Sequence, residues 1–109
     1  TTNKYRGQNM SKNNNQFLYK LEDIINERLA EGSDKSYTYQ LMQDGINQVA
    51  KKVIEESSEF AIASIQKSND KKDIVWEAAD LMYHFLILLN ASGVTLNEVS
   101  EELENRNEK

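Results

Sequence analysis

The stretch Trp76–Asn90, WEAADLMYHFLILLN, is the strongest structural signal in the sequence, because its apolar residues surround almost the whole circumference of a helix. Before Asn90, only Glu77, Asp80 and His84 interrupt the apolar surface of this stretch. Such a helix is predicted to lie in a protein interior. An ionised carboxylate left there without a partner costs far more free energy than the burial of one apolar side chain returns. We therefore expect a cationic partner for the two acids.

The composition narrows the classes of protein that fit this helix. The chain has 109 residues, of which 39% are hydrophobic and 28% are charged, as expected for one globular domain with a small core. It contains no cysteine, which excludes disulfides, thiolate metal sites and cysteine nucleophiles in this sequence. The net charge of -5 argues against binding to nucleic acid, whose phosphates require clustered Lys and Arg.

The N-terminal residues lack the apolar centre of a signal peptide, and no apolar run was expected to reach the length of a membrane span. The sequence thus predicts a soluble, cytoplasmic protein without membrane contact. Residues 1–15 are assigned to a disordered or linking segment, and residues 16–107 to one helical domain.

Helical periodicity extends over almost the whole domain, which contains no proline and no strand-like alternation. A Gly32 stop, an Asp70 cap, a Gly93 stop and a capping box of Thr95 and Glu98 mark the boundaries. Four helical segments are predicted, at roughly residues 17–31, 41–67, 70–90 and 95–106. The third has more apolar circumference than two neighbouring helices can cover, so we expect an all-α antiparallel bundle whose core is completed by a two-fold dimer.

Acidic residues form a stripe on the second segment. Lys52, Glu56 and Glu59 follow one another at spacings of four and three residues, which places them on one face of a helix. Glu55 lies at the edge of that face. The stripe borders the apolar face instead of opposing it, so these carboxylates are predicted at the border of the core.

A matching stripe of Asp73, Glu77, Asp80 and His84 follows on the third segment, at spacings of four, three and four. The residues between Glu59 and Glu77 suffice to end one helix, turn and return antiparallel beside it. Four or five carboxylates brought face to face either take up protons or bind cations. Hard oxygen ligands without cysteine suit Mg²⁺, or Mn²⁺, which commonly share a substrate's phosphates. The predicted site is magnesium-dependent, acts on phosphate and activates water.

Each feature also has a simpler interpretation. Glu55, Glu56 and Glu59 alone fit an ordinary solvated helix face. Exposure of Glu77 and Asp80 is harder to reconcile with the apolar residues around them, which favours the metal site. His84 fits a hydrogen-bonded core histidine as well as a ligand. Lys52 could touch a phosphate or only neutralise the acids.

The two acidic stripes resemble the EExxE and ExxD signature of the all-α nucleoside triphosphate pyrophosphohydrolases, the superfamily that includes MazG and dimeric dUTPases. Within it, four stretches look, in this order, like the phosphoribosyl-ATP pyrophosphohydrolase family of histidine biosynthesis. They are SYTYQLMQDG, KKVIEESSE, EAADLMYHFLILL and GVTLNEVSEELENR. The resemblance covers roughly residues 17–106. It departs at Ile54, where many members have glycine before the two acids.

The resemblance implies a MazG-like helical fold, an ATP-type nucleotide substrate and hydrolysis of 1-(5-phosphoribosyl)-ATP to 1-(5-phosphoribosyl)-AMP and pyrophosphate, the second step of the pathway. The catalytic carboxylates it implies are Glu55, Glu56, Glu59, Glu77 and Asp80. Those expected to hold Mg²⁺ are Glu56, Glu59, Glu77 and Asp80, and Glu55 is a candidate proton acceptor. The residues assigned to substrate binding are Ser36, Tyr37, Thr38, Lys52 and His84.

Three other functions were weighed. A nucleotide-pool cleaning pyrophosphohydrolase of the MazG type shares the carboxylates and differs in substrate. A helical dimerisation module would carry the acids as mere surface. A di-iron carboxylate bundle is disfavoured because its Glu-x-x-His pairs are missing: Asp80 is followed three positions on by Tyr83.

Overall fold

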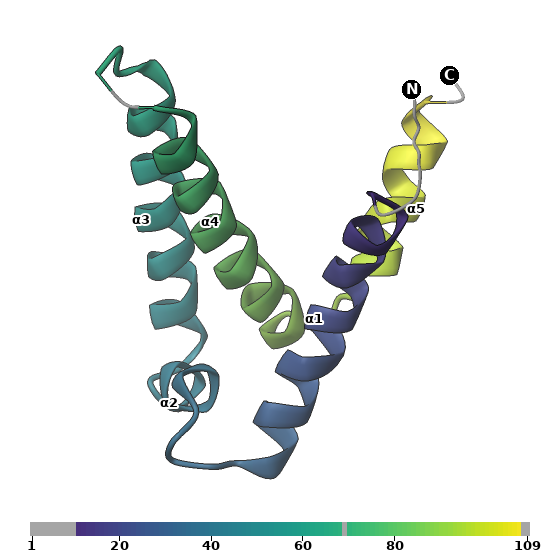
Figure 1. The fold of residues 1–109 in the computed structure, drawn as a ribbon. Coiled ribbons are helices and arrows are strands. Elements are labelled where there is room, and N and C mark those ends of the chain that lie inside the picture. Colours follow the sequence, from purple (N-terminus) through teal and green to yellow (C-terminus); the bar gives the residue numbers. More distant parts are fainter. Residues whose placement is uncertain (1–10, 69, 108–109) are drawn as a thin grey trace.

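The computed structural model describes residues 11–68 and 70–107, and within these ranges the chain is helical without any strand (Figure 1). The helices are α1 (Ser11–Glu31), α2 (Tyr37–Gln43), α3 (Ile46–Ile65), α4 (Lys71–Ala91) and α5 (Leu96–Asn107). The predicted all-α class is confirmed, and the described residues contain one helix more than the four segments expected.

The predicted N-terminal segment, residues 1–15, is only partly within the described ranges. Residues 1–10 lie outside them, and residues 11–15 belong to α1. These five residues include neither Gly nor Pro, so a helix already nucleated by the amphipathic stripe can extend through them. The other end of α1 lies at Glu31, directly before Gly32 as expected.

The additional helix, α2, begins between the first two predicted segments and runs into the start of the second. The Ser36 side chain accepts a hydrogen bond from the Tyr39 backbone N–H at 3.2 Å and so caps the first turn. Helix α3 begins at Ile46, three residues after α2 ends. The two helices are separate because Gly45 between them has non-helical dihedral angles, φ 99° and ψ 162°. That combination is open essentially to glycine alone, so one predicted segment becomes two helices.

Replacing Gly45 with alanine is therefore expected to destabilise the protein by about 1 to 3 kcal/mol, the usual cost of a residue held in such a region. An added Cβ would meet no atom within 4 Å, so the loss would come from the backbone and not from a clash. Chemical denaturation of Gly45→Ala measures it. Gln48→Ala, an exposed change in the next turn, is the control and should lie within about 0.5 kcal/mol of the parent. A Gly45→Ala variant as stable as this control would contradict the argument.

Helices α3 and α4 form an antiparallel hairpin (Figure 1). The Asp70 carboxylate caps α4 by accepting a hydrogen bond from the Asp73 backbone N–H at 3.1 Å, as predicted. The second acidic stripe therefore returns beside the first. This is the arrangement that the spacing between Glu59 and Glu77 predicted.

The core lies where α1 crosses the C-terminal part of α4, near α2 and the start of α3. Its fully buried apolar residues are Ile25, Val49, Leu86 and Ile87.

The Thr95 and Glu98 capping box forms at the start of α5 as predicted, with hydrogen bonds of 2.9 and 3.1 Å in the two directions. The Glu22 carboxylate accepts a bond from the Leu96 N–H at 2.7 Å, which joins α1 to the first turn of α5.

The single chain is open. In Figure 1 the α3–α4 hairpin and the pair of α1 and α5 diverge as the two arms of a V. The radius of gyration is 16.1 Å, against about 13 Å for a compact domain of this length. Much apolar surface is therefore left uncovered by the chain's own helices.

Helix α4 shows this most clearly. Among the described residues it is long and apolar enough to cross a membrane, judged by length and composition alone, and only 17% of its apolar window is buried. By length and composition, the expectation that no apolar run would approach such a length was wrong, because the apolar window of α4 keeps a mean hydropathy of 1.3 despite its charged residues.

Candidate active site between α3 and α4

Three carboxylates converge between the two helices of the hairpin. Glu56 and Glu59 come from α3 and Glu77 from α4, and one oxygen of each lies within 4.8 Å of the others. Residues three apart on a helix share a face, and antiparallel packing turns that face of α3 towards the matching face of α4. We call Glu56, Glu59 and Glu77 the carboxylate cluster.

The cluster contains oxygens that the protein leaves unsatisfied. Glu56 is only 5% exposed. One buried oxygen of Glu56, Oε1, and one of Glu77, Oε1, have no hydrogen-bond partner in the described part of the chain. A buried acceptor without a partner costs about 1 to 3 kcal/mol, and more when it is charged. Two such oxygens beside a third carboxylate fit a hard divalent cation.

Lys52 meets part of this charge. Its Nζ lies 3.2 Å from Glu56 Oε2 and 3.9 Å from Glu55 Oε1. The hydrogen bond to Glu56 raises the pKa of Lys52, so the ammonium remains charged at neutral pH. Lys52 thus neutralises one side of Glu56, as the simpler interpretation expected, but Glu56 Oε1 on the other side has no such contact.

The electrostatics of Glu77 show the strain of the cluster. Desolvation raises the pKa of this half-buried carboxyl, and the charges of Glu59, Asp80 and Glu56 raise it further. Its ionised form is therefore disfavoured when no cation is present. A divalent ion bound among these groups would reverse the sign of the local field.

The remaining predicted carboxylates lie beside the cluster. Asp80, one turn after Glu77, is half-buried and contributes charge to it, but is not among the three that converge within 4.8 Å. Glu55 has a side chain that is 49% exposed and turns towards Lys52. The assignment of Asp80 to the metal and of Glu55 to proton transfer stays a prediction.

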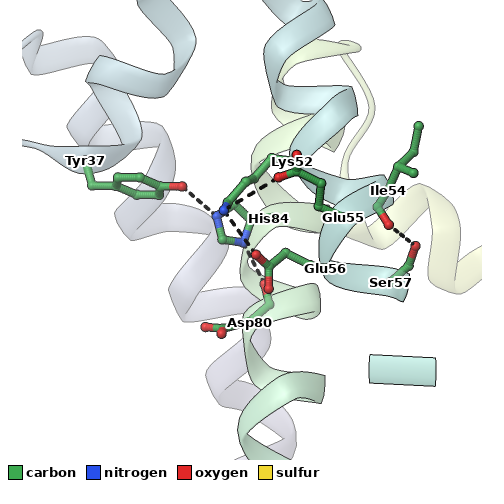
Figure 2. A network of polar contacts seen from close by, with 8 residues as sticks. All are labelled: Tyr37, Lys52, Ile54, Glu55, Glu56, Ser57, Asp80 and His84. Carbon is green, nitrogen blue, oxygen red and sulfur yellow. Dashed lines mark hydrogen bonds and ion pairs between the residues drawn. The ribbon is translucent and has the colours of Figure 1, made fainter. Parts of the chain in front are cut away.

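A second polar group connects α2 to α4 (Figure 2). The Tyr37 hydroxyl lies 2.8 Å from His84 Nε2, and His84 Nδ1 lies 2.7 Å from the backbone oxygen of Asp80. Next to it, the Thr38 and Tyr83 hydroxyls share a hydrogen bond. The rings of Tyr37 and Tyr83 stack with centroids 6.4 Å apart. These two bonds join α2 to α4 across sequence separations of 47 and 45 residues.

The structure gives the residues assigned to substrate different surroundings. Tyr37 is 50% exposed, whereas Thr38 and His84 are buried and already hydrogen-bonded within the protein. Ser36 uses its side chain to cap α2. Their contacts with substrate stay predictions.

The hydroxyl of Tyr83, which bonds to Thr38, was not among the predicted site groups. The available signal was a phenol on an apolar helix, since the hydroxyl of a buried Tyr usually finds a partner. Trp76, at the start of the stretch predicted to lie in a protein interior, is 70% exposed in the single chain.

The chain resembles proteins of known name over most of its length. Residues 18–107 match the family described as phosphoribosyl-ATP pyrophosphohydrolase. The phosphoribosyl-ATP pyrophosphatase of Pyrobaculum aerophilum is 45% identical over 91 residues, which cover 84% of this chain and 95% of that relative. That of Clostridium acetobutylicum is 41% identical over 95 residues, covering 87% and 84%.

A longer relative matches as well. The histidine biosynthesis bifunctional protein HisIE of Buchnera aphidicola is 41% identical over 99 residues, covering 91% of this chain and 45% of that protein. The family match covers residues 18–107 and therefore includes the α3–α4 hairpin with its carboxylates. The chain belongs to the phosphoribosyl-ATP pyrophosphohydrolase family and is a hydrolase.

Proposed function

We propose that this protein hydrolyses 1-(5-phosphoribosyl)-ATP to 1-(5-phosphoribosyl)-AMP and pyrophosphate, the second step of histidine biosynthesis. The observation that carries the proposal is the carboxylate cluster, in which two buried oxygens lack a partner in the described chain. Family membership supplies the substrate, since the matching relatives are named for phosphoribosyl-ATP or histidine biosynthesis.

The residues of the site fit Mg²⁺, with Mn²⁺ as the alternative, because all of the ligands are hard carboxylate oxygens. Glu56, Glu59 and Glu77 would hold the ion, with Asp80 one turn away to complete its ligands or those of a second ion. When bound, it would offset the charge of the triphosphate and favour departure of pyrophosphate.

The protein groups around the cluster would orient the reactants. Lys52 Nζ has further N–H groups beyond its bond to Glu56, and its side chain is 34% exposed, so it can contact a triphosphate oxygen from the edge of the site. Glu55, on the exposed side of Lys52, would accept the proton of the attacking water. Ser36, Thr38 and His84 are proposed to act on the substrate through the position that they give to α2.

The reaction is tested by pyrophosphate release from phosphoribosyl-ATP compared with a panel of ribonucleoside and deoxyribonucleoside triphosphates. With Mg²⁺, phosphoribosyl-ATP is expected to have a kcat/KM at least about a hundredfold above the others, because the contacts to its second sugar are absent from simple nucleotides. Removal of Mg²⁺ with a chelator should abolish release. A deoxyribonucleoside triphosphate hydrolysed faster than phosphoribosyl-ATP would favour the nucleotide-pool cleaning alternative.

The active form is proposed to be a homodimer. Large apolar side chains are exposed at the turn end of the α3–α4 hairpin, and these are Ile62, Ile65, Val75 and Trp76, at 52, 79, 58 and 70%. We call them the hairpin patch. Trp76 and Val75 also line an open groove with Lys71, Lys72 and Ala79. A second copy of the chain would cover this surface and the exposed apolar sides of α4. The sequence predicted such a dimer from the apolar circumference of the same helix.

The uncovered apolar sides of α4 also indicate where the protein acts. The Glu77 carboxylate of α4 meets Glu56 and Glu59 of α3, so a partner subunit is a better cover than a bilayer for the apolar sides of α4. The net charge of -5 disfavours nucleic acid as a partner. We therefore propose a cytoplasmic enzyme with a nucleotide substrate and a second copy of itself as partners.

A further inference from the structure

Tyr37 is placed at the edge of the candidate site by its neighbours on both sides. It is the first residue of α2, directly after the capping Ser36. Its hydroxyl is held by the buried His84 on α4, at 2.8 Å, and its residue surface is 50% exposed. A fixed hydroxyl on a partly exposed ring can contact a ligand without further ordering.

The direction of the bond between Tyr37 and His84 follows from the other side of the imidazole. The backbone oxygen of Asp80 can only accept, so His84 Nδ1 carries a hydrogen and donates to it at 2.7 Å. In the tautomer that carries its hydrogen on Nδ1, the second ring nitrogen is an acceptor, and the Tyr37 hydroxyl can supply the hydrogen. His84 Nε2 therefore accepts, and the Tyr37 O–H donates.

The Tyr37 oxygen is thereby left as an acceptor for any further partner, because a phenol has one hydrogen. Desolvation raises the pKa of Tyr37 further above neutrality, against the opposing effect of Lys52, so the hydrogen is retained at physiological pH. An acceptor of this kind repels phosphate oxygens, which are acceptors too. It fits a hydroxyl or amine donor.

The surroundings of Tyr37 indicate which donor it meets. The charges of Lys52, Glu56 and Asp80 act on the Tyr37 phenol, which places it beside the groups proposed to hold the triphosphate. Figure 2 draws the contacts of Tyr37 and His84 together with the ion pair of Lys52 and Glu56. The part of a nucleotide that adjoins its phosphates is the sugar that carries them, and that sugar offers hydroxyl donors.

We propose that the Tyr37 oxygen accepts a hydrogen bond from a hydroxyl of the ribose that carries the triphosphate, and so selects ribonucleotides over deoxyribonucleotides. This inference rests on the proposed function, since it assumes that the triphosphate binds at the carboxylate cluster. His84 is the positioning residue, because it takes the only hydrogen of the phenol and fixes the direction of its free electron pairs.

The test is calorimetric binding of a nonhydrolysable triphosphate, α,β-methylene-ATP, and of its 2′-deoxy and 3′-deoxy forms, all with Mg²⁺. One of the two deoxy compounds should bind the parent enzyme about fivefold more weakly than the ribonucleotide, the effect of one net hydrogen bond. Tyr37→Phe should weaken binding of the ribonucleotide by a similar factor and make all three dissociation constants equal. Tyr39→Phe, on the same helix, is the matched control and should keep the discrimination.

Two outcomes would overturn the inference. One is equal binding of all three compounds by the parent enzyme. The other is a Tyr37→Phe variant that discriminates as the parent does, or that weakens all three compounds alike. Either result can occur in an enzyme that still releases pyrophosphate from phosphoribosyl-ATP, in which case only the role of Tyr37 fails. Absence of that turnover in the parent would instead contradict the proposed function.

Discussion

Replacing Glu77 with glutamine is expected to abolish most of the turnover of phosphoribosyl-ATP and, without metal, to raise the melting temperature. Turnover should fall about 10²- to 10³-fold, the usual loss when one preorganised electrostatic contact to developing charge is removed. The gain in stability has a separate cause. Glutamine keeps the shape of the side chain and removes one of the charges that repel Glu56 and Glu59.

The sign of the stability change follows from the pKa of Glu77, which is raised above its ordinary value of 4.5. A carboxyl with a raised pKa in the folded state binds its proton more tightly there than in the unfolded chain. Its contribution to stability is present below pH 4.5 and is lost as the pH rises through the higher folded-state pKa. At neutral pH the parent has lost this contribution, whereas the uncharged Glu77→Gln has no such loss.

Thermal melts at neutral pH, with and without Mg²⁺, measure both effects. In the parent, Mg²⁺ at about one hundred times its Kd should add about 2.7 kcal/mol of stability. Glu77→Gln should start from a higher melting temperature and gain less from Mg²⁺. Glu101→Gln, an exposed change on α5, is the control with the same loss of one charge. A Glu77→Gln variant that keeps parental turnover and parental response to Mg²⁺ would support the surface interpretation of the acids.

Trp76→Glu is expected to convert the proposed dimer into monomers. A tryptophan at the centre of an interface contributes about 2 kcal/mol or more, which is roughly a 30-fold change in Kd, and a carboxylate in its place would add a desolvation cost. Sedimentation at low micromolar concentration should give twice the 12.6 kDa chain mass for the parent and the single mass for the variant.

Leu103→Glu on α5 is the matched control, because Leu103 is also an exposed apolar residue, at 60%, but lies on the other arm of the V. It should leave the dimer intact. Dimers that persist in Trp76→Glu would show that the hairpin patch is not the interface. Monomers in the parent itself would contradict the dimer as a whole.

Much of the fold could be predicted because its signals are local. The Asp70 cap and the Thr95–Glu98 capping box each operate within three residues, and both form as expected. Gly45 was harder to interpret. A glycine between two helical patterns can be tolerated within a helix or can break it, and only its dihedral angles show that α2 and α3 are separate.

Spacings of three and four residues fix which side chains share a face of each helix, and they therefore limit which acids can meet. Which of them converge depends on the rotation of α3 and α4 about their own axes, and packing along the whole length of both helices sets that rotation. It brings Glu59 to Glu77 and leaves Asp80 beside the group. The bond between Tyr37 and His84 joins residues 47 positions apart, and no local pattern encodes such a contact.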